Sequence, residues 1–170
     1  MDKKEEIIDS KSWLTLIFLS IIWGSSFILI KKGLIAFDPS QMAALRITIS
    51  GLAFIPFMVL YLKKVDWSKF KYLLLVGLTG SGVPAFLYAI AETRIDSNIA
   101  GILNSLTPLF TLVFGIIIYK LESKWAKMWG VLLGFIGALI IIIFGQEVGS
   151  ESFTHLWYAL LIVLATMMYA

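Results

Sequence analysis

The sequence is divided into six long apolar blocks separated by short polar segments, and this pattern restricts the fold more than any other feature. The blocks cover residues 13–34, 41–62, 70–91, 97–119, 126–145 and 155–170. Five of them reach the length of about 20 residues with which a helix crosses the hydrocarbon core of a membrane. No block shows the alternation of period two that a lipid-facing β-barrel needs. Because only helices pair all their own backbone groups in lipid, we expect an all-α polytopic membrane protein, a five-helix transmembrane bundle followed by the start of a sixth helix.

The composition supports this assignment and excludes other classes. Hydrophobic residues make up 59% of the chain, charged residues make up 15%, and the mean hydropathy is +0.92. These values are too apolar for the surface of a soluble domain of this size. The basic residues form short runs between apolar blocks instead of a continuous patch, so the lipid bilayer is an expected partner and nucleic acid is not.

The chain carries few groups that could support catalysis or metal binding. It has no cysteine and a single histidine, His155, which excludes disulfides, cysteine nucleophiles and multi-histidine metal sites within these residues. The glycines of residues 77–82 lack the Lys-Ser/Thr pair of a phosphate-binding loop. We therefore expect no enzyme, no cofactor and no metal, and ATP-driven pumping by this chain is disfavoured.

The basic residues are distributed unequally between the two sides of the expected membrane topology. Ten lie on one side, namely Lys3, Lys4, Lys11, Lys63, Lys64, Lys69, Lys71, Lys120, Lys124 and Lys127. The opposite side has only Lys31, Lys32 and Arg94. By the positive-inside rule, residues 1–12 form a cytoplasmic tail and residues 146–154 form an external loop. The first block is too long for the apolar part of a signal peptide, so it is expected to be a retained helix.

The last block indicates an internal repeat. It is still apolar at Ala170, and residues 160–170 show a weak similarity to residues 14–24. We therefore expect residues 155–170 to be the truncated start of a second repeat. Since five spans is an odd number, that repeat would begin on the external side and lie inverted, which is a recurrent plan of transporters.

Several short motifs follow one another along residues 13–145. They are Trp23-Gly24-Ser25-Ser26-Phe27 with Lys31, then Ala44-Leu45-Arg46, Tyr88-Ala89, Ala100-Gly101-Ile102-Leu103, Leu106-Thr107-Pro108, Glu122, and Gly130, Gly134, Gly137 and Ala138. Their order and spacing resemble the EamA-type permeases of the drug/metabolite transporter superfamily. Residues 92–96 are more charged than the linker expected at this place. Two explanations are open: the charges adjust the protein to its substrate, or they form a polar outer turn.

This resemblance implies a fold and a function. Residues 13–145 would be the first five-helix repeat of a ten-helix permease built from two inverted halves. The permease would be a secondary transporter in a bacterial inner membrane that exports amino acids, other metabolites or drugs. Its substrate cavity would lie between the halves, so a small-molecule substrate and the remaining C-terminal half are the expected partners.

Two ionisable side chains fall within the expected helices near their outer ends. Arg46 and Glu92 would each cost about 2.5 kcal/mol or more at depth in lipid unless they are paired or hydrated. We expect them to line an outer vestibule whose aromatic walls are Trp23 and Tyr88, and we assign Ser26 of the Trp23 motif to the same substrate cavity. Snorkelling of Arg46 to the membrane surface is the alternative.

The fourth block adds polar residues to this expected cavity. It contains Asn98 and Asn104 and is interrupted by Pro108. Asn104 and Pro108 are four residues apart and share one helix face, and polar side chains in lipid turn toward the bundle interior. We expect all three to line the cavity, with hydrogen bonding between helices as the alternative.

Two blocks carry small residues whose expected role is structural. Gly130, Gly134 and Ala138 recur every four residues and let helix backbones approach closely, so they are expected to form a helix-packing face, through which a homodimer could also associate. Residues 77–84 combine glycines with Pro84 and weaken the helical ladder in mid-membrane. Two interpretations of this segment remain: a kink that serves only packing, or a hinge or substrate site.

Two function classes besides transport remain open at this level. The chain could serve as a non-transporting membrane scaffold or subunit that associates through its small-residue helix face, or as an intramembrane enzyme. The candidate polar residues named above are confined to the first four expected helices and form no acid–base set, which favours transport over catalysis.

The expected orientation can be tested by cysteine labelling, because the chain has no cysteine of its own. Single cysteines at Asp38 and Ser150 are expected to react with an impermeant maleimide in intact cells, whereas cysteines at Ser10 and Lys64 are not. Labelling of the second pair alone would reverse the orientation. Permeabilised cells provide the control that all four cysteines are reactive.

Overall fold

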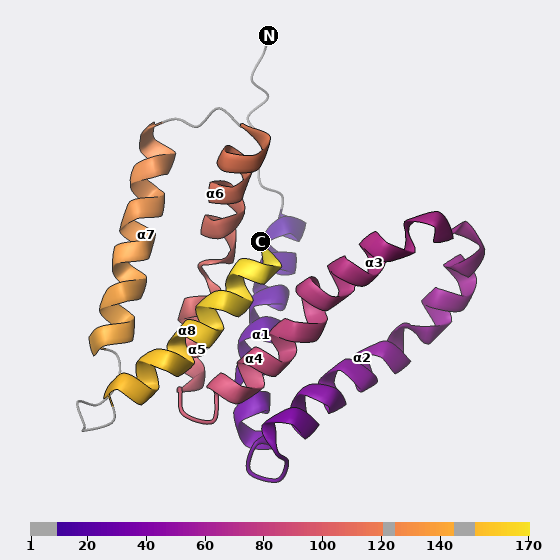
Figure 1. Ribbon diagram of the computed structural model, residues 1–170, viewed down its shortest axis with the longest axis horizontal. Helices are drawn as coiled ribbons and strands as arrows, with labels where there is room; N and C mark the ends of the chain where they lie inside the picture. The colour runs from indigo at the N-terminus through magenta and orange to yellow at the C-terminus, as the bar shows by residue number, and fades with distance from the viewer. Residues whose placement is uncertain (1–9, 121–124, 145–151) are drawn as a thin grey trace.

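The computed structural model describes residues 10–120, 125–144 and 152–170, and within these residues the chain is helical and has no strand (Figure 1). The α-helices are α1 (Ser10–Gly33), α2 (Pro39–Tyr61), α3 (Phe70–Gly77), α4 (Val83–Ala91), α5 (Ser97–Asn104), α6 (Thr107–Tyr119), α7 (Trp125–Phe144) and α8 (Ser152–Tyr169). Two 3₁₀ turns, η1 (Leu62–Lys64) and η2 (Trp67–Lys69), connect α2 to α3.

Four helical stretches are long and apolar enough to cross a membrane, and they are Ser10–Gly33, Pro39–Lys64, Trp67–Ala91 and Ser97–Tyr119. α7 and α8, with 20 and 18 residues, coincide with the fifth and sixth apolar blocks. The expected all-α, multi-pass membrane fold is therefore confirmed. Residues 1–9 of the expected tail, residues 146–151 of the expected outer loop and Glu122 of the motifs lie outside the described residues.

The third span changes its winding where glycines and a proline interrupt it. α3 and α4 are joined by η3 (Leu78–Gly82), a π-helical turn after which the N–H of Val83 donates to the carbonyl of Leu78, five residues earlier. Pro84 follows in the first turn of α4, where its missing N–H does least harm. The weak segment expected in this block is thus a π-helical turn inside one continuous span, a form of bulge often found at functional sites.

The fourth span is broken between α5 and α6. Pro108 has no N–H to donate to the carbonyl of Asn104, and the hydroxyl of Thr107 donates to that carbonyl instead, at 2.8 Å. The Ser105 hydroxyl donates to the carbonyl of Ile102 at 2.6 Å. The Thr107 hydroxyl therefore replaces the backbone bond that Pro108 cannot make, as a broken helix in lipid requires, and the break places Asn104 at the end of α5.

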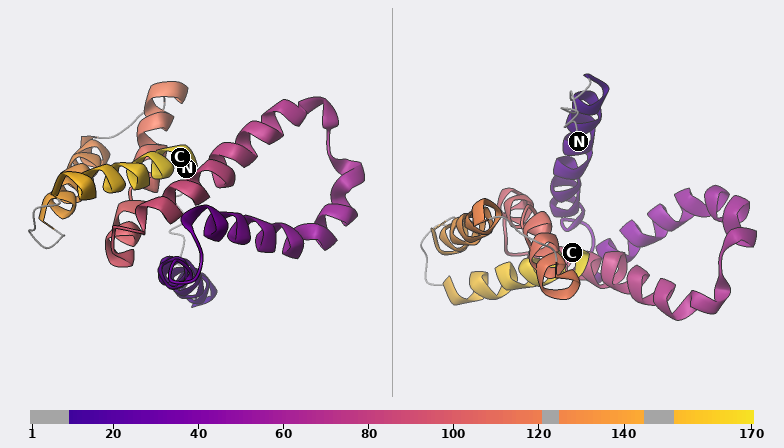
Figure 2. Two further views of the ribbon diagram at one scale, coloured as in Figure 1. Left: turned by 60° about the horizontal axis from the view of Figure 1, so that its bottom comes forward. Right: turned by 90° about the horizontal axis from the view of Figure 1, so that it is seen from above.

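The centre of the molecule forms around α8. This helix lies against α4, α5 and α6, while α2 packs on α4 and α1 packs on α5 (Figure 1). The main cluster of buried side chains includes Tyr88, Leu103, Phe110 and Ile162 from four of these helices. Figure 2 shows the hairpin of α2 and α3 extending away from this centre, with α1 projecting in a different direction.

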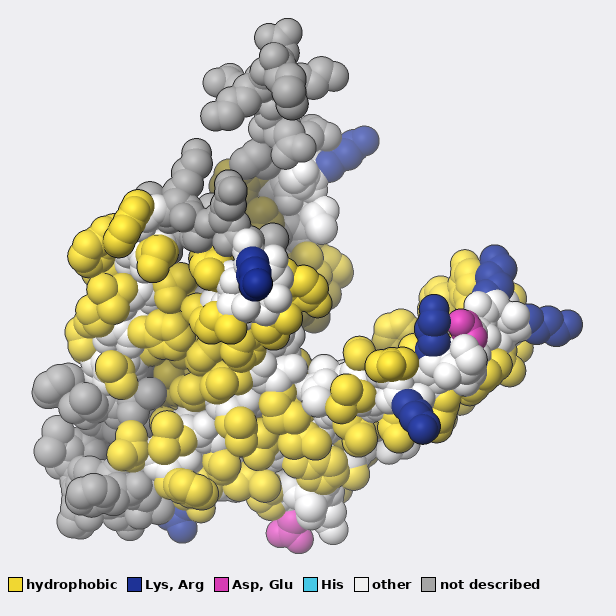
Figure 3. Space-filling view, turned by 45° about the horizontal axis from the view of Figure 1, so that its top comes forward, with side chains coloured by type: hydrophobic (Ala, Val, Ile, Leu, Met, Phe, Trp, Pro, Cys, Tyr) yellow, Lys and Arg dark blue, Asp and Glu magenta, His cyan; other side chains and the backbone are white. Residues whose placement is uncertain are grey.

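Much of the remaining surface is apolar. Leu14 on α1, Phe54 on α2 and Val76 on α3 are each about two-thirds exposed, at 66%, 67% and 66%. Hydrophobic side chains dominate the face seen in Figure 3, and Lys and Arg side chains gather at the tip of the α2–α3 hairpin. This distribution fits helices that contact lipid or further transmembrane helices along their length and reach the headgroups at the hairpin tip.

The small residues of α7 have unequal surroundings. A Cβ placed on Gly134 would collide with the end of the Leu109 side chain on α6, and Ala138 is buried in the main cluster. A Cβ on Gly130, one turn away, would have no neighbour within 4 Å. Within the described residues, the close approach of α6 and α7 therefore occurs at Gly134.

This difference gives a matched pair of variants. Gly134→Leu is expected to lower the free energy of unfolding by about 1 to 3 kcal/mol, because the added side chain overpacks the contact with Leu109. Gly130→Leu is expected to have little effect. Unfolding of the purified protein in mixed detergent micelles measures both, and equal losses would mean that another surface also covers Gly130.

Candidate functional site

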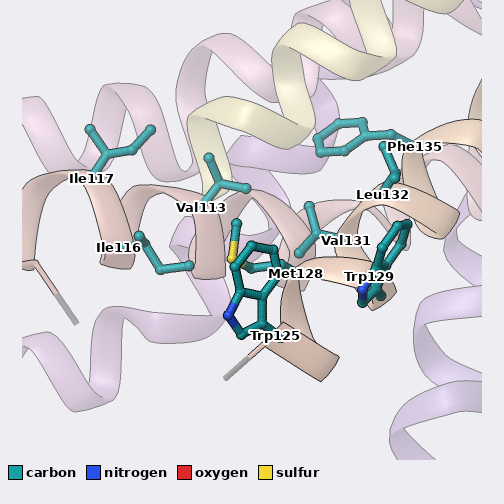
Figure 4. A pocket seen from close by; sticks show the side chains of 9 residues that line it. All are labelled: Val113, Ile116, Ile117, Trp125, Met128, Trp129, Val131, Leu132 and Phe135. Atoms are coloured by element: carbon teal, nitrogen blue, oxygen red, sulfur yellow. The ribbon is translucent and has the colours of Figure 1, made fainter. Parts of the chain in front are cut away.

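The described residues enclose three hollows of different chemistry. One is a groove of about 440 Å³ between α6 and α7, lined by aliphatic, methionine and tryptophan side chains such as Ile117, Met128 and Trp129 (Figure 4). Apolar walls of this kind suit lipid chains or another apolar helix better than a polar solute. The groove is therefore a weak candidate for the site of a polar metabolite.

The other two hollows adjoin each other beside α1. A side groove of about 850 Å³ lies between α1 and the broken fourth span, and Asn98 and Pro108 line it. A central cavity of about 450 Å³ lies where α1, α2, α4 and α8 meet. Trp23, Phe27 and Asn104 line both hollows. The central cavity combines aromatic walls with a few convergent polar groups, as ligand sites usually do.

Tyr88 of α4 organises the wall of the central cavity. Its hydroxyl donates to Oδ1 of Asn104 at 2.6 Å and lies 3.3 Å from the hydroxyl of Thr166 on α8. Its ring packs against Phe27, with centroids 5.6 Å apart, and stacks on Tyr169 at 6.0 Å. One buried side chain thus joins α1, α4, α5 and α8 around the cavity.

Arg46 supplies the positive charge of this cavity. It comes from α2, and its guanidinium donates to the hydroxyl of Ser26 on α1 at 3.3 Å. No carboxylate forms an ion pair with it among the residues that the structure describes. A guanidinium that faces a cavity with a neutral partner is suited to bind an anionic group such as a carboxylate.

Glu92 lies one residue beyond the third span and is completely buried. Its Oε2 accepts a hydrogen bond from the Ser97 hydroxyl at 3.3 Å, while Oε1 has no partner. Burial raises the pKa of Glu92 to about 7, and the bond from Ser97 and the charges of Arg46 and Lys31 oppose this rise only in part. Glu92 is not among the side chains that line the three hollows.

The structure therefore gathers some of the expected site residues and separates others. Trp23, Ser26, Arg46, Tyr88 and Asn104 line the central cavity, whereas Asn98 and Pro108 line only the side groove, and Glu92 is enclosed in the protein. Sequence reasoning did not assign Thr166 or Tyr169 to the site. Both lie in the sixth apolar block, where neither residue type has a spacing that distinguishes it from ordinary helix packing.

The chain is similar to a known protein family and to several curated proteins. Residues 11–143 match the profile of the EamA-like transporter family. An uncharacterized transporter of Archaeoglobus fulgidus is 24% identical to the chain over 92% of the chain and 54% of its own length. The uncharacterized inner membrane transporter YedA of Escherichia coli is 31% identical over 89% of the chain and 48% of its own length. No solved structure is significantly similar to the chain.

A third relative has a more specific name. A probable amino-acid metabolite efflux pump of Salmonella typhimurium is 28% identical to the chain over 78% of the chain and 44% of its own length. The chain thus spans about half the length of these curated relatives.

The hydrogen bonds of Tyr88 give a direct test of how the cavity wall is held together. Tyr88→Phe is expected to lower the free energy of unfolding by about 1 to 3 kcal/mol, because Asn104 loses its donor. Tyr72→Phe is the matched control, since Tyr72 is 71% exposed on α3. Unfolding in mixed micelles compares the two variants, and an unchanged Tyr88→Phe protein would show that water replaces the lost hydroxyl.

Proposed function

Because this chain belongs to the EamA-like transporter family, we propose that it provides one five-helix half of a secondary transporter that exports small metabolites. The second half would be an inverted copy whose first helix is α8. Two residues of α8 support this arrangement: Tyr169 lines the central cavity and stacks on Tyr88, and the buried Thr166 contacts the Tyr88 hydroxyl. The substrate path would then lie between the two halves, as in other inverted-repeat transporters.

The substrate class is inferred from the position of Arg46 in the central cavity. Among the described residues the guanidinium bonds to the neutral Ser26 hydroxyl alone, and the aromatic side chains of Trp23, Tyr88 and Tyr169 line the same cavity. A small molecule with a carboxylate and an apolar or aromatic body would satisfy both features. Amino acids and related carboxylic acids fall in this class, and the name of the Salmonella typhimurium relative points in the same direction.

The orientation in the membrane is part of the same proposal. Lys63, Lys64 and Lys69 lie in the turns between α2 and α3, whereas Lys31 and Asp96 lie at the opposite ends of their spans. With the basic turns in the cytoplasm, the central cavity lies toward the outer side of the membrane. An exporter would release its substrate from that side.

Flux measurements test the proposal. The complete gene product that carries this sequence is reconstituted into liposomes, and radiolabelled amino acids and the aromatic acid phenylacetate are offered as probes. Saturable flux of at least one probe is expected, and Arg46→Gln is expected to reduce it about tenfold or more through loss of the charged hydrogen bond. Lys32→Gln, at the exposed end of α1, is the control that removes a charge outside the cavity.

Two results would contradict this function. Absence of flux for every probe, with a protein that is folded and correctly inserted, would favour the scaffold alternative. Equal losses in Arg46→Gln and Lys32→Gln would show that the charge acts at the membrane surface and not in the cavity.

A further inference from the structure

Glu92 is the one carboxyl group that is fully buried among the described residues. One of its oxygens accepts a single long hydrogen bond from Ser97, and the other has no partner. An ionised carboxylate in such surroundings is costly unless a positive charge stabilises it, and the neutral acid is the favoured form without one. The protonation of Glu92 therefore depends on the cations near it.

Two cations act on Glu92, and both are engaged elsewhere. Nζ of Lys31 donates to the backbone carbonyls of Glu92 and Ile95, at 2.9 Å each, and lies 3.8 Å from Asp96. Arg46 donates to Ser26 inside the central cavity. Neither cation comes within 4.0 Å of the Glu92 carboxylate, yet both positive charges stabilise its ionised form.

The difference between the two cations is their access to a ligand. Lys31 is fixed at the end of α4 by two carbonyls, where a cation is favourable. Arg46 lines the central cavity, so an anion that enters the cavity neutralises its charge. Glu92 is one helical turn beyond Tyr88, which lines the same cavity, and its N–H donates to the Tyr88 carbonyl at 2.9 Å.

Other titratable groups surround this region. From α8, Tyr169 stacks on Tyr88, and Nδ1 of His155 lies 3.0 Å from the backbone carbonyl of Arg94, two residues after Glu92. Asp96 is largely exposed and is already close to Lys31. Because histidine side chains commonly carry protons in proteins, any test must separate His155 from Glu92.

We propose that Glu92 is a proton-binding site whose protonation is coupled, through the charge of Arg46, to the binding of an anion in the central cavity. With the cavity empty, Arg46 stabilises the Glu92 carboxylate. When an anion binds Arg46, this stabilisation is lost and one proton adds to a Glu92 carboxyl oxygen, with no other bond made or broken. The coupling is reciprocal, so protonation of Glu92 also strengthens binding of the anion.

This inference rests on the proposed function and makes it more specific. A monovalent anion and a proton enter or leave together, so the charge of the site is the same in the loaded and empty states. Such a transporter moves a carboxylic acid as its anion plus a proton. Its flux would therefore respond to the pH difference across the membrane and not to the membrane potential, and export would be driven by the concentration gradient of the acid.

Infrared spectroscopy of the complete, purified gene product tests the proton site without requiring transport. The C=O band of a protonated carboxyl is expected to titrate with a midpoint of about 7 and to be absent in Glu92→Gln, while His155→Gln retains it. Arg46→Gln is expected to raise the midpoint by on the order of one pH unit, because a stabilising positive charge is removed. Ser97→Ala is expected to raise it as well and provides a second test should Glu92→Gln fail to fold.

Saturating phenylacetate provides the coupling test. It is expected to raise the midpoint of the native protein and to leave that of Arg46→Gln unchanged. A band that does not titrate near neutral pH, or a midpoint that Arg46→Gln does not move, would overturn the proposal. A midpoint that moves with Arg46→Gln but not with phenylacetate would support the proton site and count against the carboxylate substrate of the proposed function.

Discussion

The requirement that every backbone polar group in lipid find a partner within the protein governs this structure. Most of the described chain meets it with continuous helices, and two places where the ladder is disturbed lie beside the central cavity. The π-helical turn of the third span precedes Tyr88 on α4, and the break in the fourth span ends α5 at Asn104. The hydrogen bond between these two side chains joins the disturbed spans to each other.

Charged groups near the ends of the spans obey the same constraint. Lys31 satisfies carbonyls at the end of α4, Arg46 faces a cavity, and Glu92 is enclosed with one oxygen unpaired. A simple ion pair between Arg46 and Glu92 would have fixed both charges permanently. Because the two side chains do not pair, the charge state of each can respond to a ligand that binds nearby. Burying charged groups without such a pair lowers the stability of the fold, which ordinary apolar packing does not.

The position of α8 connects the fold to the proposed transport function. This helix is the last of the chain, yet it contributes Ile162, Ala165 and Thr166 to the most buried part of the molecule. α1, α2 and α3 in contrast expose long apolar faces. In the proposed transporter, these exposed faces and the central position of α8 would allow two halves to share one site.

The sequence by itself determined the secondary structure and the membrane location. The features that determine them act within one segment, so they can be interpreted without knowing which helices lie beside it. They are hydropathy, segment length, Pro108 and the glycines of residues 77–82. The site could be predicted only in part. Arg46, Tyr88 and Asn104 stood out as polar or aromatic groups in apolar helices, but nothing local distinguished Thr166, which is 78 residues from the Tyr88 that it contacts.

Only the tertiary structure decided which of these groups meet. Helical periodicity gives the face on which a side chain lies, but the partner of that face depends on how the helices pack. That packing brought Arg46 to Ser26, placed Asn98 in the side groove and enclosed Glu92 beside Ser97. The physical reason is that contacts between spans depend on the complementary shapes of whole helix surfaces, to which each residue contributes little. Hydropathy, in contrast, is a property of each segment alone.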